Sequence, residues 1–124
     1  MNIRRISGRT DLHQNQSAEK EVEVINRLGL HARPASDFVR CALTFRSQIE
    51  LQVRGKTWSA QRVLDVLLAA LSQGTRFTIV ARGPDAQHAV DTLAVFLQHL
   101  AQLEADEQAS VRANRLQRFD FDDL

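Results

Sequence analysis

The spacing of apolar residues changes along this chain of 124 residues, and the order of these changes limits the possible folds more than any other feature. Apolar and polar residues alternate at 21–24, 49–53 and 77–81, which is the period of a half-buried β-strand. Arg54-Gly55-Lys56 predicts a tight hairpin turn, after which Thr57-Trp58 begins a further short strand. The sequence therefore predicts four strands.

Three other segments have the three-to-four-residue spacing of amphipathic helices. They cover about 32–44, 60–71 and 86–100, and Ser59 is a suitable N-cap residue for the second of them. The resulting order is β-α-β-β-α-β-α, a split βαβ arrangement with an added helix. It predicts an α+β open-faced β-sandwich, in which three helices cover one face of a four-stranded antiparallel sheet.

The two ends of the chain differ in composition from this central part. Residues 1–19 are mostly polar and are expected to form a flexible leader, whereas 20–102 are expected to form the domain. Residues 103–124 are expected to form a helical extension and a tail. The tail places two phenylalanines among aspartates and arginines, which is typical either of a solvated end or of a short docking peptide.

Composition excludes several classes of function. The net charge of +1 favours neither bulk nucleic-acid binding nor a polybasic membrane anchor, and no apolar run is long enough to span a membrane. The single cysteine, Cys41, allows no internal disulfide and fits a reducing cytoplasm. We expect no metal, because His88 and His99 have no further ligand at suitable spacing, and no cofactor.

The segment 26–36 concentrates the residues that can perform chemistry. Gly29 permits a sharp turn, and Pro34 suits the first turn of a helix. His31 is therefore expected at a helix N-terminus, where free backbone N–H groups attract phosphate. A histidine at such a position can also be a simple cap or a solvated side chain. Arg33 adds a permanently charged fork that matches phosphate oxygens.

The run Leu28-Gly29-Leu30-His31-Ala32-Arg33-Pro34-Ala35 closely resembles the active-site signature of the HPr family, the histidine-containing phosphocarriers of the bacterial sugar phosphotransferase system. The related nitrogen-type carriers, called NPr, have the same signature. The resemblance covers about residues 21–100. It implies an open-faced sandwich, in agreement with the order of elements.

The resemblance also implies a function and a set of site residues. His31 would take a phosphoryl group on Nδ1 from enzyme I and pass it to IIA-type acceptor proteins, as a carrier in a relay rather than an independent turnover enzyme. Arg33 and the backbone N–H groups of Ala32 and Arg33 would hold the phosphate. Val63 and Leu64 would form an apolar patch for partner proteins.

One position departs from a pattern seen in many HPr proteins of Gram-positive type. Where those proteins carry a serine that a regulatory kinase phosphorylates, this chain has Arg62, which would belong to the partner surface. Three functions stay open: a carrier for sugar uptake, a nitrogen-type regulatory carrier, and a regulatory binding module that transfers no phosphate. We expect a cytoplasmic monomer.

Overall fold

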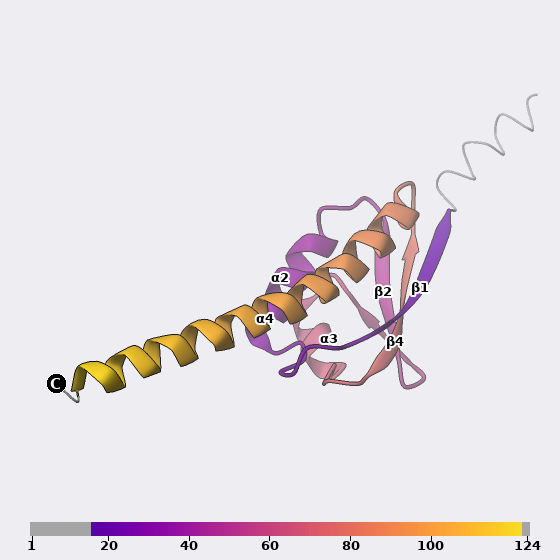
Figure 1. Ribbon diagram of the computed structural model, residues 1–124. Helices are drawn as coiled ribbons and strands as arrows, with labels where there is room; N and C mark the ends of the chain where they lie inside the picture. The colour runs from indigo at the N-terminus through magenta and orange to yellow at the C-terminus, as the bar shows by residue number, and fades with distance from the viewer. Residues whose placement is uncertain (1–15, 123–124) are drawn as a thin grey trace, which may run out of the picture.

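The computed structural model describes residues 16–122, and it describes side chains as far as residue 113 (Figure 1). A sheet forms one layer, and the helices pack on one of its faces (Figure 1). The strands are β1 (Ser17–Glu23), β2 (Gln48–Val53), β3 (Lys56–Ser59) and β4 (Arg76–Arg82), and the helices are α2 (Ala32–Ala42), α3 (Val63–Leu68) and α4 (Ala86–Asp122).

The strands form one sheet in the order β1-β4-β2-β3, and every neighbouring pair is antiparallel. The β2–β3 hairpin closes through Arg54 and Gly55, whose φ angles of 49° and 78° are both positive. Two such residues make the kind of turn that matches the twist of paired strands. The predicted α+β open-faced sandwich and its order of elements are confirmed.

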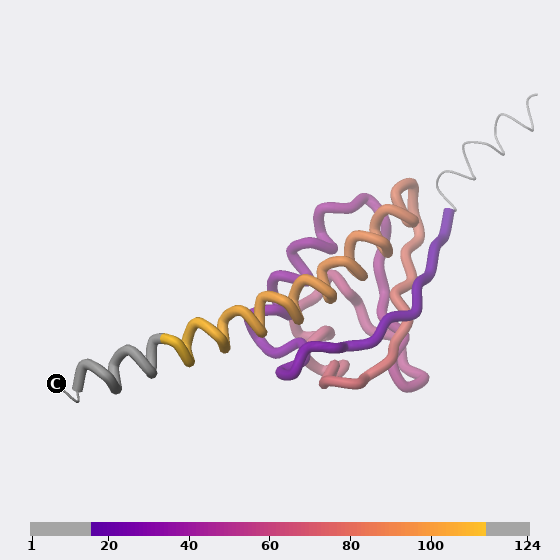
Figure 2. The backbone as a smooth tube through the Cα atoms, viewed as in Figure 1, coloured from indigo at the N-terminus to yellow at the C-terminus, as the bar shows by residue number. Residues whose placement is uncertain are grey.

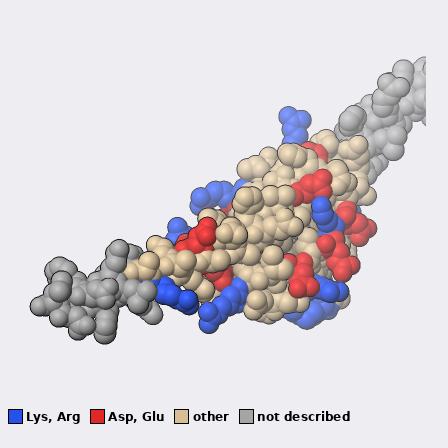
Figure 3. Space-filling view, in the orientation of Figure 1, with Lys and Arg blue, Asp and Glu red and all other residues tan. Residues whose placement is uncertain are grey.

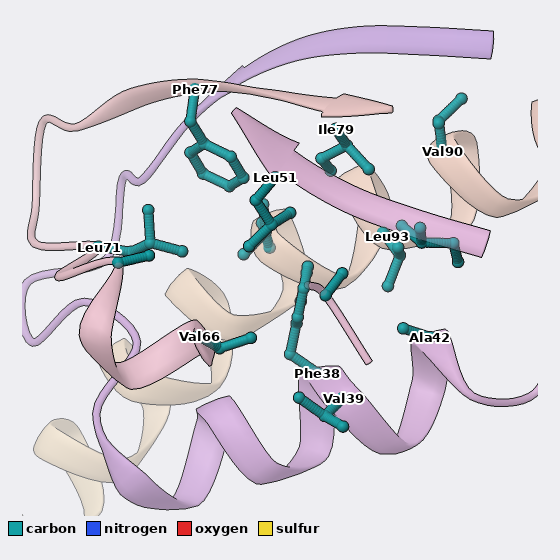
Figure 4. Close-up of a cluster of buried hydrophobic side chains, with 14 of the residues drawn as sticks. Phe38, Val39, Ala42, Leu51, Val66, Leu71, Phe77, Ile79, Val90 and Leu93 are labelled. Atoms are coloured by element: carbon teal, nitrogen blue, oxygen red, sulfur yellow. The ribbon is translucent and has the colours of Figure 1, made fainter. Parts of the chain in front are cut away.

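The core lies between the sheet and the helices (Figure 4). Phe38 of α2 is fully buried, and its ring meets that of Phe96 edge to face, with 5.7 Å between ring centres. Strands and helices contribute to one continuous apolar cluster, which fixes α2 against the sheet. Its largest fully buried apolar side chains are Phe38, Ile49, Leu51, Ile79, Leu93, Val24, Val53, Val66 and Val90.

The second predicted helix differs from the structure in length and in its buried face. A helix was expected over about 60–71, but α3 has only six residues, and Ala70, two residues after its end, has a φ of 53°. The sequence pattern predicts a wide buried stripe on this helix. Val66 is the only buried residue of α3. Of the six residues expected on the apolar face, Ala60 and Leu71 lie outside α3 and are buried, whereas the other four are exposed, in line with the partner patch expected at Val63 and Leu64. These exposed residues are Val63, Leu64, Leu67 and Leu68.

The prediction that Ser59 is the N-cap of this helix is also wrong. Ser59 is the last residue of β3, and the N-cap position belongs to Arg62. The Ser59 hydroxyl instead accepts a hydrogen bond from the backbone N–H of Gln61, at 3.1 Å. Asp65 in the first turn of α3 accepts a bond from the Ser59 N–H at 2.9 Å, which ties the helix to β3.

The two end elements, β1 and α4, reach beyond the residues 20–102 expected for the domain, and α4 covers most of the helical extension and tail expected over 103–124. β1 begins at Ser17, before the start at residue 20 that was expected for the domain, whereas residues 1–15 lie outside the described part. α4 continues without interruption to Asp122, and its C-terminal part projects away from the sheet (Figures 1 and 2). Within residues 16–122, no helix is both long and apolar enough to cross a membrane.

Candidate functional site

The loop between β1 and α2 carries the candidate site, and its backbone is closely constrained. Gly29 has a φ of 66°, as its predicted turn requires. A Cβ atom at Gly29 would lie 2.4 Å from the carbonyl oxygen of Leu71. The next residue, Leu30, donates its N–H to that same oxygen at 2.9 Å. The segment after α3 therefore holds the loop just before His31.

His31 occupies the N-cap position of α2, as predicted. Its side chain is exposed and makes no capping hydrogen bond, while its carbonyl oxygen accepts the N–H of Ala35 at 2.8 Å. Pro34 lies in the first turn and is buried. Within the described residues, no protein group accepts a hydrogen bond from the N–H of Ala32 or Arg33. These two donors and the positive end of the helix dipole are thus available beside the imidazole.

Arg33 lies with His31 on the wall of a hollow of about 260 Å³. Its side chain is exposed, and among residues 16–113 it forms no ion pair. A cation in the first turn of a helix faces the unfavourable end of the helix dipole. A bound phosphate would balance both the guanidinium and the dipole, and it would lie against the ring of His31.

Sequence reasoning missed a residue that contacts this loop from far along the chain. Glu104 of α4 is only 9% exposed, and it accepts hydrogen bonds from the Asn26 side-chain amide and the Leu28 N–H, each at 2.9 Å. Leu100, Leu103 and Glu107 line the same hollow as His31. Glu104 lies in a polar, alanine-rich stretch, and the only signal for it was the predicted continuation of the last helix.

The structure separates the predicted partner-binding residues from the hollows at His31. Arg62, Val63 and Leu64 are all exposed, and Leu64 is 67% exposed, so they form an accessible surface on α3. A second hollow at His31, of about 240 Å³, is lined by Leu28, Leu30 and residues 70–72 rather than by α3 itself. Ala70, Leu71 and Ser72, which follow α3 in the chain, line a hollow with His31, whereas no residue of α3 lines either hollow.

Other reactive side chains have structural surroundings. Cys41 packs against the core, and burial raises the pKa of its thiol, so the thiol stays protonated at neutral pH. His88 meets Phe45 edge to face, with 5.4 Å between ring centres. Among the described residues, no three side chains of the metal-binding types form a cluster. Acidic and basic residues are mixed on the face seen in Figure 3, without a large patch of one sign.

Comparison with solved structures relates this fold to that of HPr proteins. A phosphocarrier protein HPr from Bacillus anthracis str. Ames has 35% sequence identity and a TM-score of 0.64, covering 66% of this chain and 98% of that one. A crystal structure of Crh from Bacillus subtilis, reported as a dimer with a swapped domain, has 39% identity and a TM-score of 0.54, covering 64% and 92%.

Sequence comparison leads to the same group of proteins. Phosphocarrier protein HPr from Haemophilus influenzae (strain ATCC 51907 / DSM 11121 / KW20 / Rd) is 44% identical over 78 residues, covering 63% of this chain and 92% of the relative. The HPr-like protein Crh from Bacillus subtilis (strain 168) is 39% identical over 80 residues. Residues 18–99 match the family described as the PTS HPr component phosphorylation site. The chain therefore belongs to the HPr family, the phosphocarriers of the phosphotransferase system.

Proposed function

We propose that this protein accepts a phosphoryl group on His31 from enzyme I and passes it to IIA-type acceptor proteins. The observation that carries the proposal is the placement of an exposed, uncapped histidine beside two helical N–H groups and an arginine for which residues 16–113 provide no hydrogen-bond acceptor and no ion-pair partner, respectively. Each of these groups suits the acceptance of a dianionic phosphoryl group. The phosphoryl group would originate from phosphoenolpyruvate.

The transfer requires little covalent chemistry from the protein. A neutral imidazole of His31 would attack the phosphorus atom through a ring nitrogen, Nδ1 by family resemblance. A new N–P bond forms as the N–P bond of the donor histidine breaks, and the donor ring keeps the bonding electron pair. The N–H groups of Ala32 and Arg33 and the Arg33 guanidinium would hold the three equatorial oxygens, where charge is spread in the transition state.

Partner proteins would dock on α3. Leu64 and Val63 expose apolar surface there, and Arg62 adds a positive charge at the start of the helix. An exposed apolar patch with a charged rim is a suitable surface for a transient protein complex. Arg62 has no hydroxyl group, so a serine kinase of the HPr type is expected to leave this position unmodified. We further propose that the protein acts in the cytoplasm as a monomer.

The test is phosphorylation by purified enzyme I and radiolabelled phosphoenolpyruvate. The wild-type chain is expected to acquire a label that is stable in base and lost in acid, as an N–P bond is. His31→Ala is expected to acquire none, while its circular dichroism stays that of the wild type, because the exposed His31 side chain supports no core contact. A fully labelled His31→Ala variant would show that another residue is phosphorylated.

A second candidate is regulation without transfer, because the solved relative Crh from Bacillus subtilis is described as a catabolite repression protein. A wild-type protein that binds partners but takes no label from enzyme I would support this alternative. If the protein does take the label, it should be offered to a panel of IIA-type acceptors from sugar-uptake and nitrogen-type systems. The acceptors that receive the label would distinguish the two kinds of carrier.

A further inference from the structure

We propose that Glu104 is a positioning residue, which holds the loop before His31 in the conformation that accepts phosphate. The inference deepens the proposed function and rests on it. Glu104 belongs to the part of α4 that follows the family-matched segment, which ends at residue 99. The C-terminal extension, which contains Glu104, would thus contribute directly to the phosphate site.

The Glu104 carboxylate bridges two groups of the loop. One oxygen accepts a hydrogen bond from Asn26 Nδ2 and the other accepts one from the Leu28 N–H, each at 2.9 Å. Glu104 is 9% exposed and Asn26 is 3% exposed, so water has little access to the first of these contacts. Hydrogen bonds to a shielded carboxylate are among the stronger kinds in proteins.

Asn26 transmits this constraint toward His31. Its Nδ2 atom also donates to the carbonyl oxygen of Gly29 at 2.9 Å, and the Gly29 N–H donates back to the Asn26 carbonyl oxygen at 3.3 Å. Gly29 comes two residues before His31. The loop is therefore held from α4 through Asn26, and from the segment after α3 through Leu30. Together these contacts set the direction in which the imidazole and the first N–H groups of α2 point.

The negative charge of Glu104 allows its positioning role to be distinguished from a purely electrostatic effect by the direction in which the phosphorylation rate changes. Glu104 and Glu107 both line the hollow that contains His31 and Arg33. Two carboxylates near an incoming phosphate repel it, so removal of either charge should speed phosphorylation if electrostatics alone matters. Glu104, unlike Glu107, also bonds the loop. A glutamine at 104 presents an NH₂ group to one of two donors, and Asn26 cannot flip without turning its oxygen toward the Gly29 carbonyl.

The experiment compares Glu104→Gln with Glu107→Gln in the full chain. Phosphoramidate serves as a small donor that needs no docking surface: the N–P bond to His31 forms as the P–N bond of phosphoramidate breaks and ammonia leaves. Intact mass gives the rate, at a temperature well below the unfolding transition of each variant. We expect Glu104→Gln to be roughly tenfold to a hundredfold slower than wild type, as displaced reacting groups are. Glu107→Gln should match or exceed the wild-type rate.

Kinetics with enzyme I as the donor separate kcat from KM, and a merely structural role for Glu104 would not change kcat alone. With saturating phosphoenolpyruvate and the carrier as varied substrate, Glu104→Gln should lower kcat by a similar factor while KM, set by the α3 surface, stays unchanged. In the wild-type protein the Leu28 N–H should also exchange slowly with deuterium, because it is bonded to Glu104. This last measurement applies even if the variant does not fold.

The outcomes separate this inference from the proposed function. Equal rates for Glu104→Gln and Glu107→Gln with both donors would overturn the positioning role alone, as would rapid exchange of the Leu28 N–H. A change confined to KM would also overturn it, because docking rather than positioning would then depend on Glu104. A wild-type chain that takes no phosphoryl group on His31 from either donor would overturn both proposals.

Discussion

Replacement of Gly29 by alanine tests how tightly the loop before His31 is built. The left-handed backbone at Gly29, with a φ of 66°, is unfavourable for alanine by about 1–2 kcal/mol. The added Cβ would also lie 2.4 Å from the Leu71 carbonyl oxygen, which is a backbone atom and cannot move by rotation of a side chain. The loop must shift, and the Leu30–Leu71 hydrogen bond would be lost or lengthened.

The chain contains a matched control for this substitution. Gly55 has a similar φ of 78°, but a Cβ there would meet nothing within 4 Å. Gly55→Ala should therefore show the backbone term alone, about 1–2 kcal/mol. Gly29→Ala should lose about 1–3 kcal/mol more, the range for leaving a buried backbone donor unpaired.

Urea denaturation of both variants gives the two free energies of unfolding, and phosphorylation from phosphoramidate gives the effect on the site. We expect Gly29→Ala to be the less stable variant and to react more slowly, while Gly55→Ala keeps the wild-type rate. Equal losses of stability would refute the reasoning, because they would mean that the contact with Leu71 contributes nothing.

Three further predictions concern charged residues. Arg33→Ala should slow phosphorylation of His31 without abolishing it, raising the activation barrier by about 2–4 kcal/mol; a wild-type rate from enzyme I would make Arg33 an ordinary surface residue. Arg62→Glu should slow transfer from enzyme I, more at low salt than at high salt, whereas a rate that responds to neither charge nor salt would place Arg62 outside the docking surface. Burial raises the pKa of Asp85, but hydrogen bonds from the Ser47 hydroxyl and from the Arg46 and Ser47 N–H groups outweigh it and lower that pKa overall. The ionised carboxylate therefore stabilises the fold above pH ~4. Thermal unfolding should show that the stability difference between wild type and Asp85→Asn shrinks as the pH falls below that value. A stability difference that does not change with pH would contradict this prediction.

The sequence alone determined those features that depend on residues close together in the chain. Alternating residues predicted the strands, and Gly55 predicted the hairpin, because glycine adopts a positive φ without steric cost. The positive φ of Arg54 was not predictable, because arginine does not favour that conformation. The turn at Gly29 and the helix start at His31 were also predictable, because glycine and proline act on the backbone within a few residues. Turns and helix starts of this kind can therefore be predicted from the sequence alone.

Only the tertiary structure decided which faces and which distant residues meet. The apolar period of α3 is the same whether its residues point inward or outward, and packing against β3 and α2 turned Val63, Leu64, Leu67 and Leu68 outward. The contact of Glu104 with Asn26 spans 78 positions and joins two polar residues, neither of which belongs to an apolar pattern. The spacing of apolar residues predicts the secondary structure of one segment at a time. The contact of Glu104 with Asn26 forms only when the packed core brings α4 against the loop.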